Sequence, residues 1–254
     1  MGVITGNMSS EILGMKMNYT AILPEQLSGP YPVLYLLHGR SDDDKAWLYN
    51  ISLVRYAASK KLAIIMPQVH LSYYTDMKIG GDYWTFLTEE FPKKMKHQFH
   101  ISTSPAETFV AGLSMGGYGA LKWGLSYPDQ VAGIATLSAA TDVFGLWERD
   151  ASREKSFSAI FGSKDELKDS ANDLLAVLEA AKEKEPLPAV LQICGTEDFL
   201  YKDNLIFKGL IEQMNIDYTF IEGSGGHDWD FWDKRIQDVL EWIEGMLKGT
   251  SDRF

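Results

Sequence analysis

Short runs of apolar and β-branched residues alternate along this chain with longer stretches whose apolar positions recur at helical spacing. A pair of strands is predicted near the N-terminus, within Met8–Leu23. Further strands are predicted at PVLYLL (32–37), LAIIMP (62–67), TFVAGL (108–113), VAGIATLS (131–138), AVLQIC (189–194) and DYTFIE (217–222). Most of these runs are apolar on both faces, which is typical of parallel strands covered by helices on either side.

Helices are predicted between these strands, near 45–60, 82–99, 116–126, 202–214 and 231–247. Strands that alternate with helices indicate an open, doubly wound, mostly parallel α/β sheet with helices on both faces. In such a sheet the chemistry lies at the carboxyl ends of the strands. The segment 139–186 is longer than an ordinary connection and mixes aromatic with charged residues. We therefore expect a single domain, residues 1–254, in which 139–186 forms a small cap-like helical insertion.

Composition narrows the classes of partner. The chain has 254 residues, of which 45% are hydrophobic, and this is enough for one compact core. Its formal net charge of −11 argues against nucleic acid and anionic membrane surfaces as partners. The sequence has no apolar stretch of about 20 residues and no pattern of a secretory signal. A single cysteine, Cys194, excludes an intramolecular disulfide framework and favours a reducing compartment, so we expect a cytoplasmic location.

A serine at the junction of a predicted strand and a predicted helix is the first candidate for chemistry. The pentapeptide Gly112–Gly116 matches the pattern G-x-S-x-G, with Ser114 at its centre. Its small flanking glycines allow a sharp turn that holds the serine hydroxyl out at the end of the strand. The alternative is an ordinary glycine-rich turn with a serine that caps the helix. Because strand and helix both flank the motif correctly, we expect Ser114 to be a nucleophile.

A nucleophilic serine needs a base and an acid, and in this kind of turn they follow it in the order serine, acid, histidine. Four of the five histidines precede Ser114, so His227 is the one candidate for the base. The acid is expected in the loop after the strand 189–194, at Asp198 in preference to Glu197. The alternative is that both acids are only loop or capping charges.

The remaining site residues are expected around this triad. Backbone N–H groups of Met115 and Arg40 are predicted to stabilise an oxyanion, since Met115 follows the nucleophile and Arg40 follows an early strand. At least one of Phe144 and Trp147 is expected to contact the substrate from the cap, and Trp229 either lines the pocket or anchors the last helix.

No metal and no cofactor are expected. The acidic run 42–44 lacks the alternating spacing of a calcium loop, and the pair His97 and His100 has no further ligands placed to complete a zinc site.

Four motifs together resemble those of the esterase D-like α/β-hydrolases, and within them the tributyrin esterases of bacteria: LLHG, GLSMGGYGAL, CGTEDFLY and GGHDWDFW, in this order. The resemblance covers Ser10 to Leu247. It implies the α/β-hydrolase fold. It also implies the nucleophile Ser114, the acid Asp198 and the base His227, with the amides of Met115 and Arg40 as oxyanion donors.

By this resemblance the chain is expected to be a serine carboxylesterase that hydrolyses small-molecule esters with short acyl chains through an acyl-enzyme, without a cofactor. The family also includes S-formylglutathione hydrolases, feruloyl and acetylxylan esterases and mycolyltransferase-like enzymes, and it includes homo-oligomers. A rival from another class is an inactive binding module. One departure from the family is Arg40, because relatives commonly have a smaller or apolar residue there, which leaves the shape of the acyl pocket open.

Overall fold

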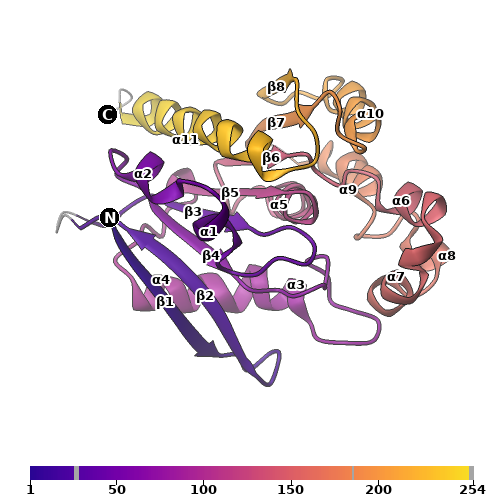
Figure 1. Cartoon of the computed structure of the whole chain (residues 1–254), viewed down its shortest axis with the longest axis horizontal. Helices are drawn as coiled ribbons and strands as arrows, with labels where there is room; N and C mark the ends of the chain where they lie inside the picture. Colours follow the sequence, from indigo (N-terminus) through magenta and orange to yellow (C-terminus); the bar gives the residue numbers. More distant parts are fainter. Residues whose placement is uncertain (26–28, 185, 252–254) are drawn as a thin grey trace.

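The centre of the molecule is one eight-stranded sheet in the order β1-β2-β4-β3-β5-β6-β7-β8 (Figure 1). The computed structural model describes residues 1–25, 29–184 and 186–251. β1 pairs antiparallel with β2, and β2 pairs antiparallel with β4, while all pairs from β4 to β8 are parallel. The strands are β1 (Gly2–Ser9), β2 (Lys16–Leu23), β3 (Val33–Leu37), β4 (Ala63–Pro67), β5 (Thr108–Leu113), β6 (Gly133–Leu137), β7 (Ala189–Gly195) and β8 (Tyr218–Gly223).

Helices cover both faces of the sheet, as the two-sided apolar strands predicted. Successive side chains of a strand point to opposite faces, so on β3 Val33, Tyr35 and Leu37 pack into one core and Leu34 and Leu36 into the other. The first core is shared with α3, α4, α5, α9 and α10, and the second with α1, α2 and α11. The helices are α1 (Ala46–Asn50), α2 (Leu53–Ala57), α3 (Tyr83–Thr85), α4 (Phe91–Gln98), α5 (Met115–Ser126), α6 (Val143–Arg149), α7 (Glu154–Phe161), α8 (Lys164–Leu167), α9 (Leu174–Ala181), α10 (Tyr201–Ile211) and α11 (Trp229–Ser251).

The strands and helices follow the predicted order, with differences in detail. β1 begins at Gly2, earlier than expected, because this edge strand is largely exposed and its apolar residues Val3 and Ile4 are adjacent instead of alternating with polar ones. The helix expected at 45–60 is divided into α1 and α2, and the one expected at 82–99 contains a π-helical turn at Phe86–Glu90. No helix in the described ranges is long and apolar enough to cross a membrane.

The segment 139–186 has two parts with different roles. α6, α7 and α8 gather beyond the end of the sheet, to one side of the molecule in Figure 1. α9 instead packs on α5 and buries Leu174, Val177, Leu178 and Ala181 in the sheet core. The cap is therefore the first part of the segment, through α8, and α9 is an ordinary crossover helix that returns the chain to β7.

Candidate active site

Ser114 occupies a sharp turn between β5 and α5. Its backbone angles, φ 52° and ψ −114°, lie outside the regions that L-residues ordinarily adopt. A Cβ at Gly112 would lie 2.4 Å from the carbonyl carbon of Gly116, and a Cβ at Gly116 would lie 2.4 Å from the carbonyl oxygen of Leu37. Both positions of the motif therefore require glycine. The Ser114 amide donates to the carbonyl oxygen of Leu137 on β6 at 2.9 Å, which fixes the turn against the sheet.

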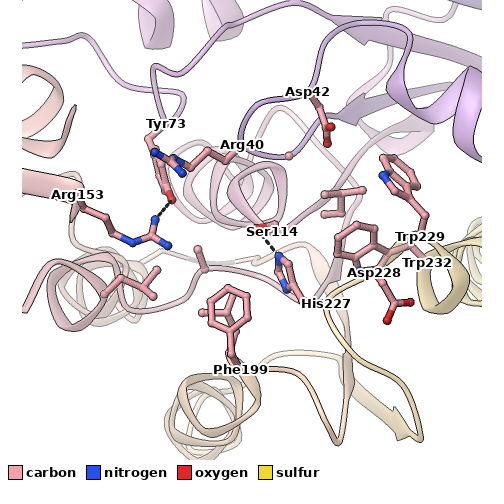
Figure 2. Close-up of a pocket in the computed structure, with 15 residues that line it drawn as sticks. Arg40, Asp42, Tyr73, Ser114, Arg153, Phe199, His227, Asp228, Trp229 and Trp232 are labelled. Atoms are coloured by element: carbon pink, nitrogen blue, oxygen red, sulfur yellow. Dashed lines mark hydrogen bonds between the residues drawn. The ribbon is translucent and has the colours of Figure 1, made fainter. Parts of the chain in front are cut away.

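The structure brings Ser114, His227 and Asp198 together from three loops at the carboxyl edge of the sheet. Figure 2 shows Ser114 and His227, joined by a dashed line. His227 Nε2 lies 2.9 Å from Ser114 Oγ, and His227 Nδ1 lies 2.9 Å from Asp198 Oδ2. The Asp198 side chain is fully buried, and its Oδ1 also accepts the Leu200 amide at 2.8 Å. An ionised buried carboxylate next to Nδ1 selects the tautomer in which Nδ1 carries the proton and Nε2 can accept one from the serine.

Glu197, the alternative acid, binds the backbone of Gly225 in the loop that carries His227. Its carboxylate accepts the Gly225 amide, and its own amide donates to the Gly225 carbonyl oxygen at 3.2 Å. The two loops approach so closely that a Cβ at Gly195 would lie 2.0 Å from the Gly225 carbonyl oxygen. Asp198 therefore faces the imidazole, while Glu197 joins the loop after β7 to the loop after β8.

Aromatic rings enclose the imidazole of His227. The Phe199 ring centroid lies 4.6 Å away, and the Trp232 ring meets the imidazole edge-on at 5.0 Å. Trp229 lies at the start of α11, where it lines the pocket and also packs edge-on against Trp47 and Trp232. These contacts limit rotation of the ring about its bond to Cβ.

The amides of Arg40 and Met115 are both unoccupied donors. Among the described residues, no backbone or side-chain group accepts from either N–H. Met115 is the first residue of α5, so its amide also lies at the positive end of the helix. Either donor is therefore available to a substrate oxygen.

His38 holds the peptide unit that carries the Arg40 N–H, a role that the sequence reasoning missed. The Val69 amide donates to His38 Nε2 at 3.1 Å, so Nδ1 carries the proton and donates it to the Gly39 carbonyl oxygen at 2.8 Å. Complete burial lowers the pKa of His38 to about 4, which keeps the ring neutral. Since the N–H and C=O of a trans peptide point in opposite directions, this bond orients the Arg40 N–H. Its position directly before Gly39 is the signal that could have indicated this role.

A pocket of about 460 Å³ opens above Ser114 and His227. The cap contributes Leu146 and Arg153 to its wall, whereas Phe144 and Trp147 do not line it, contrary to the prediction. Trp147 is 2% exposed, and its indole N–H donates to Glu154 at 2.8 Å. Neighbouring residues of a helix point about 100° apart, and in α6 it is Leu146 that faces the pocket while Trp147 turns into the cap.

Two polar lining residues, Tyr73 and Arg153, could not be recognised from the sequence. They are 80 positions apart, and Arg153 Nη1 donates to the Tyr73 hydroxyl at 3.3 Å. Neither lies in a motif.

Among the residues that the structure describes, no group of three or more His, Cys, Asp or Glu side chains is placed to hold a metal ion.

Comparison with known proteins places this arrangement in a family. Residues 10–243 match the family described as "Putative esterase". The chain is 30% identical to the acetyl esterase of Caldicellulosiruptor saccharolyticus over 96% of this chain and 98% of that protein. Among solved structures it resembles the substrate-bound fluorophosphonate-binding serine hydrolase F (FphF) of Staphylococcus aureus, with a TM-score of 0.90 and 35% identity, over 95% of this chain and 98% of that one. The S-formylglutathione hydrolase (FrmB) of the same organism gives a TM-score of 0.86 at 35% identity, with the same coverage of both chains.

These similarities confirm two expectations from the sequence, the α/β-hydrolase fold and an esterase family. The match spans nearly the whole chain, and it includes all the loops that meet at Ser114. This chain belongs to the esterase family and is a carboxylic ester hydrolase with the α/β-hydrolase fold.

Proposed function

We propose that this chain is a serine carboxylesterase that hydrolyses short-chain acyl esters, with Ser114 as nucleophile, His227 as base and Asp198 as the acid that orients it. One observation carries the proposal. The side chains form an unbroken series of hydrogen bonds, 2.9 Å from Ser114 Oγ to His227 Nε2 and 2.9 Å from His227 Nδ1 to Asp198 Oδ2. A serine hydroxyl becomes a good nucleophile only when a base within hydrogen-bond reach takes its proton.

In acylation, Ser114 Oγ forms a bond to the ester carbonyl carbon while its proton passes to His227 Nε2. The bond between that carbon and the leaving alcohol then breaks, and His227 gives its proton to the departing oxygen. Asp198 stabilises the imidazolium in between. Water repeats the sequence in place of the alcohol, which releases the carboxylic acid and restores the serine.

The negative charge that develops on the carbonyl oxygen is stabilised by the amides of Met115 and Arg40 in this proposal. Their support is that both N–H groups lack a protein acceptor within the described ranges and that His38 fixes the peptide of one of them. A preorganised donor of this kind is typically worth about 10²- to 10³-fold in kcat. The side chain of Arg40 plays no part in this step, because the donor is the backbone.

Short acyl groups, as in tributyrin, fit the proposal for two reasons. The pocket of about 460 Å³ is small, and a relative with 30% identity is an acetyl esterase. A second candidate is hydrolysis of S-formylglutathione, favoured by the similarity to a hydrolase of that name at 35% identity. Comparison of kcat/KM for p-nitrophenyl acetate, butyrate and octanoate, S-formylglutathione and methyl ferulate ranks these classes of substrate.

The decisive experiment replaces Ser114 with alanine. We expect kcat to fall by about 10⁴-fold or more, together with loss of covalent labelling by a fluorophosphonate probe. The matched control is Ser126→Ala at the far end of α5, which should leave both unchanged. Thermal midpoints verify that each variant is folded. Activity retained in Ser114→Ala would contradict the assignment, and wild-type protein that is folded but never labelled would favour an inactive binding module.

A cytoplasmic location and a homo-oligomeric state remain predictions that accompany this function. Cell fractionation tests the first, and light scattering on the purified protein tests the second.

A further inference from the structure

Two arginines line one wall of the pocket and converge on a tyrosine. Arg40 follows β3, Arg153 lies between α6 and α7, and Tyr73 belongs to the long connection after β4. Figure 2 shows both guanidinium groups beside the Tyr73 side chain, on the opposite side of Ser114 from Trp229. The hydrolytic mechanism above uses none of these three side chains.

Tyr73 is a rigid centre for this group. It is 3% exposed, and its ring meets those of Phe157 at 5.0 Å and Tyr118 at 5.8 Å edge-on. Its backbone φ of 49° is in the left-handed region, so the surrounding packing must hold it there. Burial raises the pKa of Tyr73, and the charges of Arg153 and Arg40 oppose that rise. The hydroxyl therefore keeps its proton, and since it accepts from Arg153, it can donate that proton to a ligand.

The charge on this wall is only partly neutralised by the protein. Arg153 Nε lies 3.0 Å from Asp150 Oδ2, and its guanidinium lies over the Phe157 ring at 5.5 Å, so the side chain is oriented. Arg40, which is exposed, forms no ion pair with any described residue. This local positive charge stands out in a chain with a formal net charge of −11. Guanidinium groups with free N–H donors bind carboxylate and phosphate oxygens by charge-assisted hydrogen bonds.

The two ends of the pocket differ in character. The end opposite the arginines is lined by Trp229 and Trp232, with the carboxylates of Asp42 and Asp228 nearby. Indole rings suit a short acyl chain, and the carboxylates repel an anion. An anionic part of a substrate is thus favoured at the arginine end, and the acyl part at the tryptophan end.

We propose that Arg40, Arg153 and Tyr73 form a subsite for an anionic group carried by the leaving alcohol or thiol. The preferred substrates are then esters or thioesters whose alcohol or thiol part bears an anionic substituent. This inference rests on the proposed function, because it assigns a leaving group to the same nucleophile. The shared chemistry is an oxyanion such as a carboxylate, held by two guanidinium groups and one hydroxyl.

The test uses two butyrate esters that differ in the charge of the leaving group, 4-carboxyphenyl butyrate and 4-carbamoylphenyl butyrate. For each protein the readout is the ratio of kcat/KM for the charged ester to kcat/KM for the neutral one. Comparison of this ratio between variants cancels the intrinsic reactivity of the leaving groups and any general loss of activity. We expect the ratio to fall about 10-fold in Arg153→Gln and a few-fold in Arg40→Gln, because Arg40 is more exposed to solvent.

The matched control is Arg55→Gln, on the exposed side of α2, which changes the net charge equally and should leave the ratio unchanged. Salt gives a second measurement that needs no variant. A net charge of −11 alone predicts that the ratio rises as salt screens repulsion, whereas the subsite predicts that it falls between about 0.02 and 0.5 M salt. This second readout decides the matter if a variant is unfolded.

The subsite is refuted if the ratio is the same in wild type, Arg153→Gln and Arg40→Gln, or if Arg55→Gln lowers it as much. A second pair of substrates, mono(4-nitrophenyl) succinate and 4-nitrophenyl butyrate, places the charge on the acyl side. If only this pair responds to Arg153→Gln, the assignment of the two ends is wrong. Failure of the subsite leaves Ser114-dependent hydrolysis of neutral esters intact, whereas failure of the proposed function appears as activity that survives Ser114→Ala.

Discussion

Two different substitutions of His38 each keep one of the two hydrogen bonds that its ring makes and remove the other. Nδ1 donates to the Gly39 carbonyl oxygen at 2.8 Å, and Nε2 accepts the Val69 amide at 3.1 Å. An asparagine places a donor near the position of Nδ1 but does not reach Val69. A glutamine reaches the position of Nε2 and leaves the Gly39 carbonyl oxygen without its donor. The two variants therefore divide the effect on the Arg40 amide from the effect on stability.

The expected magnitudes follow from these contacts. Loss of an oxyanion donor costs about 10²- to 10³-fold in kcat, and a loosened peptide retains part of that donor, so we expect kcat of His38→Gln to fall about 10-fold or more. His38→Asn should keep kcat within a few-fold of wild type. It leaves the Val69 amide, on a residue with no exposed surface, unpaired, which costs about 1–3 kcal/mol of stability.

The assay measures kcat and KM on p-nitrophenyl acetate and the free energy of unfolding in urea for both variants. The reasoning is refuted if His38→Asn loses kcat as severely as His38→Gln. It is equally refuted if kcat follows stability across the two variants, because His38 would then act only as a core residue.

Further predictions concern pH, the cap and the turn. The pKa of buried His38 is lowered from 6.5 to about 4, so the unfolded chain takes up a proton over that window and the folded chain does not. About 3 kcal/mol of stability is therefore present above pH 6.5 and lost as the pH falls towards 4, which urea titrations should show in wild type and not in His38→Gln. Trp147→Ala should lower stability by about 3–5 kcal/mol and leave the profile of kcat/KM against acyl length parallel to that of wild type, because Trp147 does not line the pocket. Leu146 lies on the cap wall with Arg153, so Leu146→Ala should instead change the profile of kcat/KM against the length of the leaving alcohol, by up to about 0.8 kcal/mol per added methylene. An acyl-length profile altered by Trp147→Ala would place Trp147 in the pocket. Gly112→Ala should abolish activity and lower the thermal midpoint, because its Cβ would lie 2.4 Å from a backbone carbon. The control Gly245→Ala places its Cβ in open space and should change neither activity nor the thermal midpoint. Equal effects of the two substitutions would exclude the steric explanation.

Most of the framework could be predicted because its signals are local. Strands that are buried on both faces have continuous apolar runs, and β5 begins and ends at the predicted residues, Thr108 and Leu113. Because the base follows the nucleophile and the acid along the chain, one histidine was available for that role, and the structure places it, His227, beside Ser114 and Asp198.

The misses concern contacts that depend on tertiary packing. Which face of a short helix such as α6 turns to the pocket is decided by partners elsewhere, and the bond from Trp147 to Glu154 draws the indole into the cap. Tyr73 and Arg153 meet only because α7 packs over the connection after β4. The apolar run Leu174–Ala181 was included in the cap, although its pattern suits a helix on the sheet.

The close contact between the loops after β7 and β8 constrains how this protein can evolve. With no room for a Cβ at Gly195 beside Gly225, an insertion or deletion in either loop would move the acid away from the base. Among the described residues, none in α6, α7 or α8 hydrogen-bonds to Ser114, Asp198 or His227, and this part of the chain leaves the sheet after β6 and rejoins it through α9. Lineages can therefore lengthen, shorten or exchange α6 to α8, and so acquire new substrates, while the inherited chemistry stays the same.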